Sequence, residues 1–600
     1  MADKFVSERN LKFLLFEVFD AASLTRQPYY ADHSRESFDM ALETALKIGK
    51  NLLKPKLQEM DKTASEFVGG RVKVHPLVRT FMKECGEGGW IGASFSFDLG
   101  GQQLPLIISA ACRFIISAAN YSASVYPMLT TGAAHLIISF GSQELKEAYL
   151  PKMLAGEWQG TMALTEPQAG SSLADITTLA EPTDQGYYKI RGQKIFISAG
   201  DHDGVDNVVH LMLAKIKGAP AGVRGISLFV VPQKRVENGG LAFNDVNTAG
   251  IYHKMGYRGS PITQLSMGEN NGCRGWLVGE PHKGLSYMFQ MMNEARIDIG
   301  SGASAIASAA YYASLEYAQQ RPQGRKVTSK DPTQPQIPII QHADIRRMLL
   351  FQRAVVEGSL ALVLQCSKYS DMERTLSGEE KEKATLLLDL LTPVAKTYPS
   401  EMGILSISAG MQCLGGYGYC DEFPLELYYR DARIHPIHEG TTGIQGITLL
   451  GRNVTMKNGA AFKLFLTEVQ AAIKQAEEFA ELKPCAQDLK EGVDRLTKVT
   501  LHLIGVAQSK GPEIFLADAT LYLEFFGIIS IAWQWLLQAV TAQKALNQGL
   551  SGSEADFYHG KIHTFRYFFK YELPKIEGLA KRLTDADGLT VDMKESFFAD

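Results

Sequence analysis

The stretch YYKIRGQKIFIS, residues 187–198, decides the fold class because it is strongly β-type in a chain whose remaining pattern is mostly helical. It is rich in β-branched and aromatic residues, and turn-forming residues such as Asp184 and Gly186 precede it. Similar short runs follow before residue 280, so we predict a mostly antiparallel β domain here. The strands that we predict are residues 187–190, 194–198, 208–214 and 226–231.

Helical periodicity lies on both sides of this β block. A helical pattern precedes it and returns near Gly284, with one proline-rich interruption at residues 321–338 that predicts a loop. Blocks of helices and strands that are segregated along the chain argue against a doubly wound α/β fold. We therefore predict a mainly α protein with a central β domain. The predicted parts are an N-terminal leader (1–37), an N-terminal helical domain (38–160), the central β domain (161–280), a helical bundle (281–457) and an additional helical domain (458–600).

The composition excludes several classes of protein. With a net charge of -4 and no long run of basic residues, nothing indicates a nucleic-acid surface. Seven scattered cysteines without a C-x-x-C pair fit a reducing compartment and no metal site. The N-terminus lacks a secretory h-region, and the apolar segments 104–140 and 525–540 read as buried helices, not membrane spans. We expect a cytoplasmic protein with no transmembrane segment.

One motif in the chain is deceptive. Residues 300–305, GSGASA, match the dinucleotide-binding pattern G-x-G-x-x-A. That pattern needs a preceding strand and a tight turn, whereas this segment continues a helical pattern of small residues. Close packing between helices explains it better.

Four other segments carry candidate chemistry, and each has a plain structural explanation as well. MALTEPQAGSSLAD (162–175) offers hydroxyls and amides that could hold a phosphate or a flavin edge, or it is an ordinary turn. KIFISAG (194–200) places an aromatic ring and a hydroxyl on one side of a strand, or it is a half-buried strand. QCLGGYGY (412–419) permits close approach of a ligand, or it is a flexible turn. YYRDARIHPIHEGTTGIQ (428–445) places Glu439 between apolar Ile437 and a glycine turn, where partial burial would make it a better base, or Glu439 is an ordinary solvated surface residue.

Together with QRPQGR (320–325), these segments resemble, in order and spacing, the signatures of acyl-CoA dehydrogenases. The resemblance covers about residues 38–455, and the whole length is similar to a longer bacterial subgroup that includes 3-methylmercaptopropionyl-CoA dehydrogenases. Five motifs in register are far more specific than any one of them. The resemblance implies the three-part fold of that family with an extra C-terminal helical domain, the cofactor FAD, and conversion of an acyl-CoA thioester to a trans-2-enoyl-CoA.

The resemblance also implies roles for individual residues. Glu439 would be the catalytic base, and hydride would pass to flavin N5. The residues that would contact FAD are Leu164, Thr165, Ser171, Phe196, Ser198 and Thr441, with Arg321, Gln323, Gln412 and Gly416 reaching the cofactor of a neighbouring subunit. Arg296, His438 and Gly440 would lie beside the substrate. Because each flavin would then need two subunits, we expect a homodimer or a dimer of dimers, with an electron-transfer flavoprotein as the acceptor.

Some positions depart from the family pattern. Ala295 stands where some members carry the base, and since alanine takes no proton, Glu439 has no rival at that position. Ser172 replaces the usual aspartate, and Gly443 replaces a polar residue that often contacts adenosine. His438 stands where many members have tyrosine, so either it makes the acyl pocket more polar or it only fills space.

Two other functions stay open at this point. An acyl-CoA oxidase would share the fold and the flavin but pass its electrons to oxygen. A catalytically silent acyl-CoA-binding protein would share the fold alone. The absence of a peroxisomal address in the final residues ESFFAD favours a dehydrogenase over an oxidase, and the intact Glu439 argues against a silent protein. The identity of the acyl group does not follow from any motif.

Overall fold

The computed structural model describes residues 4–329 and 331–599, apart from the side chains of Gln290 and Met292. Contacts divide the chain into two compact units. The sheet unit comprises residues 39–105 and 115–295, and the bundle unit comprises residues 1–38, 106–114 and 296–600. The five-part division predicted from the sequence remains a prediction, because these two units cut across it.

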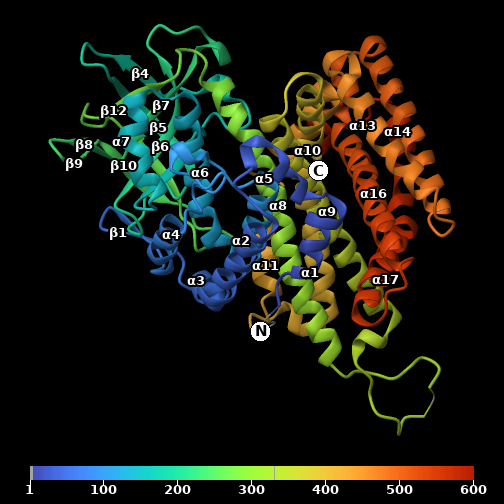
Figure 1. The fold of residues 1–600 in the computed structure, drawn as a ribbon. Coiled ribbons are helices and arrows are strands. Elements are labelled where there is room, and N and C mark those ends of the chain that lie inside the picture. The colour runs from blue at the N-terminus through green and yellow to red at the C-terminus, as the bar shows by residue number, and fades with distance from the viewer. Residues whose placement is uncertain (1–3, 330, 600) are drawn as a thin grey trace. The chain divides into compact units, whose positions relative to one another are not determined.

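The sheet unit contains every strand that the described residues form, and helices flank them (Figure 1). Its helices are α2 (Arg35–Ile48), α3 (Leu57–Lys62), α4 (Leu77–Glu87), α6 (Tyr121–Phe140) and α7 (Gln143–Leu154). Its strands are β1 (Glu66–Val68), β2 (Arg71–Lys73), β3 (Trp158–Ala163), β4 (Leu179–Pro182), β5 (Tyr188–Ser198), β6 (Asn207–Ile216), β7 (Ile226–Pro232), β8 (Lys234–Glu237), β9 (Gly240–Phe243), β10 (Val246–Ile251), β11 (Ile262–Met267) and β12 (Arg274–Val278). Two further helices, α5 (Leu106–Ala119) and α8 (Gly284–Gln320), contribute residues to both units, and residues 35–38 of α2 also belong to the bundle unit.

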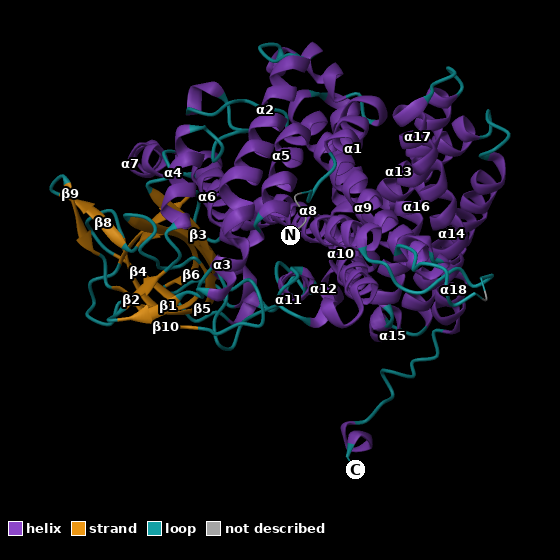
Figure 2. Cartoon of the chain, turned by 90° about the horizontal axis from the view of Figure 1, so that it is seen from below, coloured by secondary structure: helices purple, strands orange, loops and turns teal. Residues whose placement is uncertain are grey.

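The main sheet has the strand order β10-β11-β5-β12-β7-β6-β3, with β4 paired to β5 and β6. The pairings β3–β6 and β4–β6 are parallel and the others are antiparallel, as the sequence predicts. The two runs predicted at 187–190 and 194–198 form one strand, β5, with a register shift near its end. Figure 2 shows the strands gathered together with α4, α6 and α7 beside them. Helix α6 lies directly on β3, where a Cβ at Gly160 would come within 2.6 Å of the Ala133 side chain.

The bundle unit is helical, with α9, α10 and α16 side by side at its centre (Figure 1). The predicted loop follows the end of α8 and carries the pair of β-bridge residues Pro322 and Pro338. The helices of this unit are α1 (Glu8–Lys12), α9 (Ala343–Thr375), α10 (Gly378–Leu414), α11 (Leu425–Ala432), α12 (Thr442–Thr448), α13 (Met456–Ala476), α14 (Lys483–Ser509), α15 (Pro512–Ala517), α16 (Ala519–Leu546), α17 (Gly552–Tyr567) and α18 (Ile576–Asp585).

The described leader packs against the bundle unit. Tyr30 donates a 2.5 Å hydrogen bond to the buried carboxylate of Asp371, which also accepts the amides of Leu106 and Ile107 at the start of α5. The leader's Asn10 accepts a hydrogen bond from the buried Lys561 of α17. These contacts hold the described part of the leader on the bundle unit.

Helices α9 and α16 are long and apolar enough to cross a membrane, and they are the two such helices among the described residues. Their most apolar windows are 83% and 89% buried inside the protein, as in the core helices of a folded domain. All seven cysteines are free, and six of them are buried, which is the small-apolar-residue role expected of them.

Candidate active site

The predicted base lies in the loop between α11 and α12, where the backbone adopts an uncommon conformation. Glu439 has φ +52° and Gly440 has φ +89°. The left-handed region costs a non-glycine residue about 1–2 kcal/mol, so surrounding contacts must hold Glu439 in place. At Gly440 a side chain is excluded, because a Cβ there would lie 2.5 Å from Nε2 of Gln445.

Three hydrogen bonds fix this turn. Lys396 of α10 donates from Nζ to the carbonyl oxygen of Gly440 at 2.9 Å. Gln445 of α12 donates from Nε2 to the carbonyl oxygens of Glu439 at 3.2 Å and Gly440 at 3.4 Å. Thr441, predicted to touch FAD, caps α12 by accepting the amide of Ile444. The turn is thus held by α10 on one side and by α12 on the other.

The carboxylate of Glu439 is partly buried, with positive charge close by. Burial raises the pKa of Glu439, and the charges of Arg296 and Lys396 oppose part of that rise. Burial lowers the pKa of Lys396 to about 8, while Glu439 and Glu401 act in the opposite direction. A carboxylate with a raised pKa beside fixed cations is suited to accept a proton near neutral pH.

Two polar groups at this turn have no hydrogen-bond partner among the described residues. One is the backbone N–H of Glu439, which is free to bind an external acceptor. The other is Nε2 of His438, which is buried. Burial lowers the pKa of His438 well below its usual value, so its ring is neutral at physiological pH. Unpaired buried polar atoms mark places where a ligand or water completes the site.

In the sheet unit, the predicted flavin contacts lie on β5 and on the segment after β3. Phe196 has φ +57° at the register shift of β5, and 55% of its surface is exposed although its ring also packs on Tyr252. Ser198 ends the strand, and Ile195 donates its amide to the carbonyl oxygen of Thr165 at 2.9 Å. The hydroxyls of Thr165 and Ser198 bond to none of the described residues.

The sequence does not reveal the ion pair that joins these two segments. Lys194 donates to Oε1 of Glu166 at 2.8 Å and to the carbonyl oxygen of Leu164 at 3.0 Å, and both charged side chains are buried. Glu166 also accepts the amides and hydroxyls of Thr177 and Thr178. The cation of Lys194 and these donors hold the pKa of Glu166 down to about 2, against the opposing effect of burial.

The structure also places other predicted positions of the sheet unit. Ser171 is exposed, and the hydroxyl of Ser172 donates to Asp175 at 3.2 Å. Glu294, next to Ala295, is a carboxylate on α8 that the sequence analysis did not consider as a rival base. It forms a 3.0 Å pair with Nδ1 of His135.

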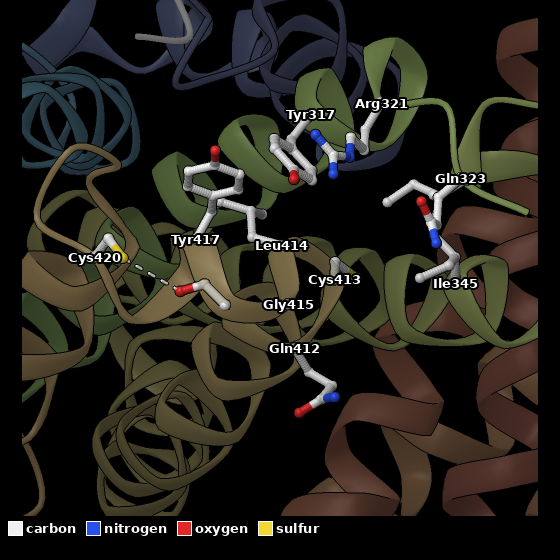
Figure 3. A pocket seen from close by; sticks show the side chains of 12 residues that line it. Tyr317, Arg321, Gln323, Ile345, Gln412, Cys413, Leu414, Gly415, Tyr417 and Cys420 are labelled. Carbon is white, nitrogen blue, oxygen red and sulfur yellow. Dashed lines mark hydrogen bonds between the residues drawn. The ribbon is translucent and has the colours of Figure 1, made fainter.

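The residues expected to reach a neighbouring subunit's cofactor line one pocket of the bundle unit, about 590 Å³ in volume. Arg321, Gln323, Gln412 and Gly416 come together there, although the chain separates the first pair from the second by a loop and two long helices. Figure 3 shows Arg321 near Tyr317 and Tyr417, with Gln412 projecting from the opposite side. The guanidinium of Arg321 forms no ion pair with any described residue, so it is available to an anion.

The glycines of QCLGGYGY have different tasks in this pocket. Gly415 ends α10 with φ +60° and ψ -136°, a conformation that only glycine adopts without strain. A Cβ at Gly418 would lie 2.2 Å from the carbonyl oxygen of Met411. Gly416 faces open space. The backbone of Gly416 is therefore open to a ligand, while the other two glycines shape the turn.

Comparison with known proteins agrees with this arrangement. Family models match in order: the acyl-CoA dehydrogenase N-terminal domain at residues 35–157, the middle domain at 161–269, the C-terminal domain at 282–454, and an acetyl-CoA dehydrogenase C-terminal-like domain at 465–594. The chain is 36% identical to a butyryl-CoA dehydrogenase of Syntrophomonas wolfei over 98% of both chains. It is also 36% identical to the 3-methylmercaptopropionyl-CoA dehydrogenase of Ruegeria pomeroyi, over 93% of this chain and 94% of that protein.

Solved structures show the same fold. An acyl-CoA dehydrogenase of Bacillus anthracis complexed with FAD has a TM-score of 0.73 at 24% identity, covering 95% of this chain and 91% of that one. ACDH-11 of Caenorhabditis elegans, complexed with C11-CoA, has a TM-score of 0.76 at 19% identity, covering 97% and 94%.

The chain belongs to the acyl-CoA dehydrogenase family. It is an FAD-dependent oxidoreductase that acts on an acyl-CoA thioester, and the predicted fold class with its additional C-terminal helical domain is confirmed.

Proposed function

We propose that Glu439 is the base of this enzyme and removes the α-proton of a short-chain acyl-CoA. The observation that carries the assignment is the Glu439 turn: a partly buried carboxylate near Arg296 and Lys396, adjacent to a backbone N–H that bonds to no described residue. A carboxylate and an unengaged amide from one residue match the two needs of thioester enolisation, which are a proton acceptor and a donor to the carbonyl oxygen.

Each group of the Glu439 turn would have its own role in removing the α-proton. The N–H of Glu439 would bind the thioester oxygen and stabilise the negative charge that develops on it. The carboxylate of Glu439 would hold the α-proton, and Arg296 would stabilise the ionised form before the transfer. Gly440 leaves room for the side-chain amide of Gln445, which holds the turn beside the substrate. His438, neutral and with one unpaired nitrogen, would lie beside the acyl group.

The residues present fit the cofactor FAD. Phe196 exposes an aromatic ring in a strained conformation, and the hydroxyls of Thr165 and Ser198 are free for a ligand among the described residues. When bound, FAD supplies the acceptor for the hydride that leaves Cβ of the acyl group. Leu164, Ser171 and Thr441 would also contact it. Arg321, Gln323, Gln412 and Gly416 would offer a pocket to a phosphate-bearing part of the cofactor of a second subunit.

We propose butyryl-CoA and 3-methylmercaptopropionyl-CoA as the first substrates to test. The support comes from the two relatives named for these reactions, each 36% identical over nearly the whole chain. The 3-methylmercaptopropionyl group is longer than butyryl by one heavy atom and contains a sulphur atom, so the two substrates together test how far the acyl pocket tolerates extra length and a thioether. We further propose a homodimer or dimer of dimers, with an electron-transfer flavoprotein as the electron acceptor. We also propose a cytoplasmic location, which the seven free cysteines support.

Anaerobic mixing of the purified enzyme with each acyl-CoA tests the proposal, with bleaching of the flavin absorbance as the readout. Glu439→Gln should slow bleaching by about 100- to 10,000-fold, the usual contribution of a general base, without loss of bound FAD. Glu481→Gln is the matched control, because Glu481 is an exposed carboxylate in a turn of the bundle unit. A Glu439→Gln enzyme that bleaches at the wild-type rate would show that another group is the base.

The same experiment separates the remaining alternatives. Slow reoxidation in air and fast reoxidation by an electron-transfer flavoprotein would support a dehydrogenase. Rapid recovery of the absorbance in air would identify an oxidase. A colourless protein that binds acyl-CoA but no FAD would identify a silent binding protein and overturn the proposal.

A further inference from the structure

A buried lysine lies beside the turn that contains the proposed base. Lys396 lies in the middle of α10, its side chain is fully buried, and its Nζ donates to the carbonyl oxygen of Gly440 at 2.9 Å. Burying an ammonium group is costly unless charge and hydrogen bonds compensate it. A lysine retained at such a site therefore calls for an explanation beyond packing.

The position of Lys396 is set by a backbone contact between α8 and α10. A Cβ at Gly300 would lie 1.9 Å from the carbonyl oxygen of Ala395 and 3.4 Å from Cα of Lys396. Arg296 lies about one helical turn before Gly300 on α8. The helix contact thus brings both cations, one from each helix, toward the Glu439 turn.

Several charged or titratable groups face Lys396. Glu439, His435 and His438 do so from the loop before α12, Arg296 from α8, and Glu401 from α10 itself. Burial lowers the pKa of His435 to about 4, and both histidines are neutral at physiological pH. The carboxylate of Glu401 accepts a 2.5 Å hydrogen bond from the hydroxyl of Thr442, which ties it to α12. Of the two carboxylates near Lys396, Glu401 is therefore held by α12. Glu439 is the one that would meet the substrate under the influence of the Lys396 charge.

We propose that Lys396 is a positioning residue for the reaction: it clamps the Glu439 turn through the Gly440 carbonyl and supplies fixed positive charge beside the Glu439 carboxylate. The proposal rests on the proposed function of Glu439 as the base. Its hydrogen bond holds the turn in the left-handed conformation that directs the Glu439 amide and carboxylate. Its charge keeps the carboxylate ionised, and so ready to accept a proton, at a lower pH than burial alone would allow.

Three substitutions of Lys396 separate the charge from the hydrogen bond. The acid limb of the pH profile is the range in which the rate of flavin bleaching falls as the pH decreases. Lys396→Gln keeps a donor and loses the charge, so this acid limb should move to higher pH, by about one unit. Lys396→Arg keeps both, and its acid limb should stay at the wild-type pH. Lys396→Met loses both, so its rate of bleaching at neutral pH should fall by about 10- to 100-fold in addition to the shift.

Lys561→Met is the matched control for the general cost of removing a buried lysine. Lys561 is also fully buried, and it pairs with Glu357 in the bundle unit at 2.8 Å. Its loss should lower thermal stability and leave the acid limb unchanged. Bound FAD is measured for every variant, and Lys396→Gln, which keeps a hydrogen-bond donor, keeps the test decisive if Lys396→Met does not fold.

The possible results are distinguishable. We call the proposed role of Lys396 the clamp. A Lys396→Gln enzyme with the wild-type rate and the wild-type acid limb overturns it. An acid limb that shifts equally in Lys396→Arg and Lys561→Met also overturns it. If Glu439→Gln is inactive while the Lys396 variants resemble wild type, only the clamp fails. If Glu439→Gln remains active, the base assignment fails and the clamp fails with it.

Discussion

Lys194 and Glu166 form an ion pair that is closed to solvent, and it joins the segment after β3 to the end of β5. The segment after β3 contains Leu164 and Thr165, and the end of β5 contains Phe196 and Ser198. The four residues predicted to border the flavin ring are therefore held by one buried interaction. Breaking such a pair by removing one partner is strongly destabilising, since the other charge stays buried and unpaired.

Glu166→Gln should therefore lower the free energy of unfolding by about 3–5 kcal/mol and reduce retention of FAD. Differential scanning calorimetry and the ratio of flavin to protein absorbance measure the two effects. Glu181→Gln is the control, because Glu181 pairs with Lys217 on the exposed surface, where ion pairs contribute about 0–1 kcal/mol. Equal losses in both variants would contradict the special role of the buried pair.

The same carboxylate predicts a pH dependence of stability. The folded pKa of Glu166 is about 2, below its ordinary value of 4.5. The unfolded state thus binds the proton more tightly, and the stabilisation is present above the unfolded pKa and is lost as the pH falls toward 2. Glu166→Gln should accordingly flatten the acid side of a plot of unfolding free energy against pH.

Gly300 gives a third prediction, which concerns helix packing. Gly300→Ala places a methyl group against the backbone of α10, so it should cost about 1–3 kcal/mol of stability and slow flavin bleaching by displacing Lys396. Gly505→Ala on α14 is the control. A Cβ at Gly505 meets no atom within 4 Å, and alanine should stabilise an exposed helix position by about 1 kcal/mol. Thermal unfolding should show a lower stability than wild type for Gly300→Ala and a higher stability for Gly505→Ala.

The sequence predicted the close helix packing at Gly300, because small residues in a helical pattern have a direct consequence for packing. It also located the loop after α8 and grouped Arg321 with Gln412 in one predicted site. Lys194 and Lys396 were missed, because a lysine in a strand or helix pattern is usually exposed and only tertiary contacts reveal its burial.

The aromatic residues near the C-terminus show the same difficulty. The number of such residues suggests an aromatic-rich interface, and the structure instead buries six of them inside the chain: Trp533, Trp535, Phe565, Tyr567, Phe568 and Phe569. Trp535 of α16 donates from Nε1 to the carbonyl oxygen of Ala354 on α9 at 3.0 Å, and Gly358 leaves room for its ring. The interface is therefore between two parts of one chain, a distinction that composition does not make. The left-handed φ of Glu439 and Phe196 was equally invisible, because both residue types are common in ordinary conformations.

The acid limb of the pH profile of the reaction rate should follow the ionisation of the Glu439 carboxyl group. Burial raises the pKa of this carboxyl above 4.5, so the base is protonated and inactive at a higher pH than an exposed glutamate would be. The rate of flavin bleaching should fall as the pH decreases through that raised pKa. Glu439→Asp should keep an acid limb but lower the rate by about 100-fold, because its carboxylate is retracted by one methylene group. A limb that persists in Glu439→Gln at measurable activity would assign it to a different group.

His438 should influence the choice of substrate without shaping the pH profile. Its ring is neutral because burial lowers its pKa well below 6.5, and its Nε2 has no partner among the described residues. If it contacts the acyl group, His438→Tyr should change the ratio of kcat/KM for 3-methylmercaptopropionyl-CoA and butyryl-CoA by about tenfold in favour of the latter. The acid limb should stay in place, since Glu439 is untouched. His502→Tyr, at an exposed position of α14, is the control. An unchanged ratio would mean that His438 only fills space in the wall of the site. If its neutral imidazole contacted the sulphur-bearing chain, replacing it would change the kcat/KM for that substrate.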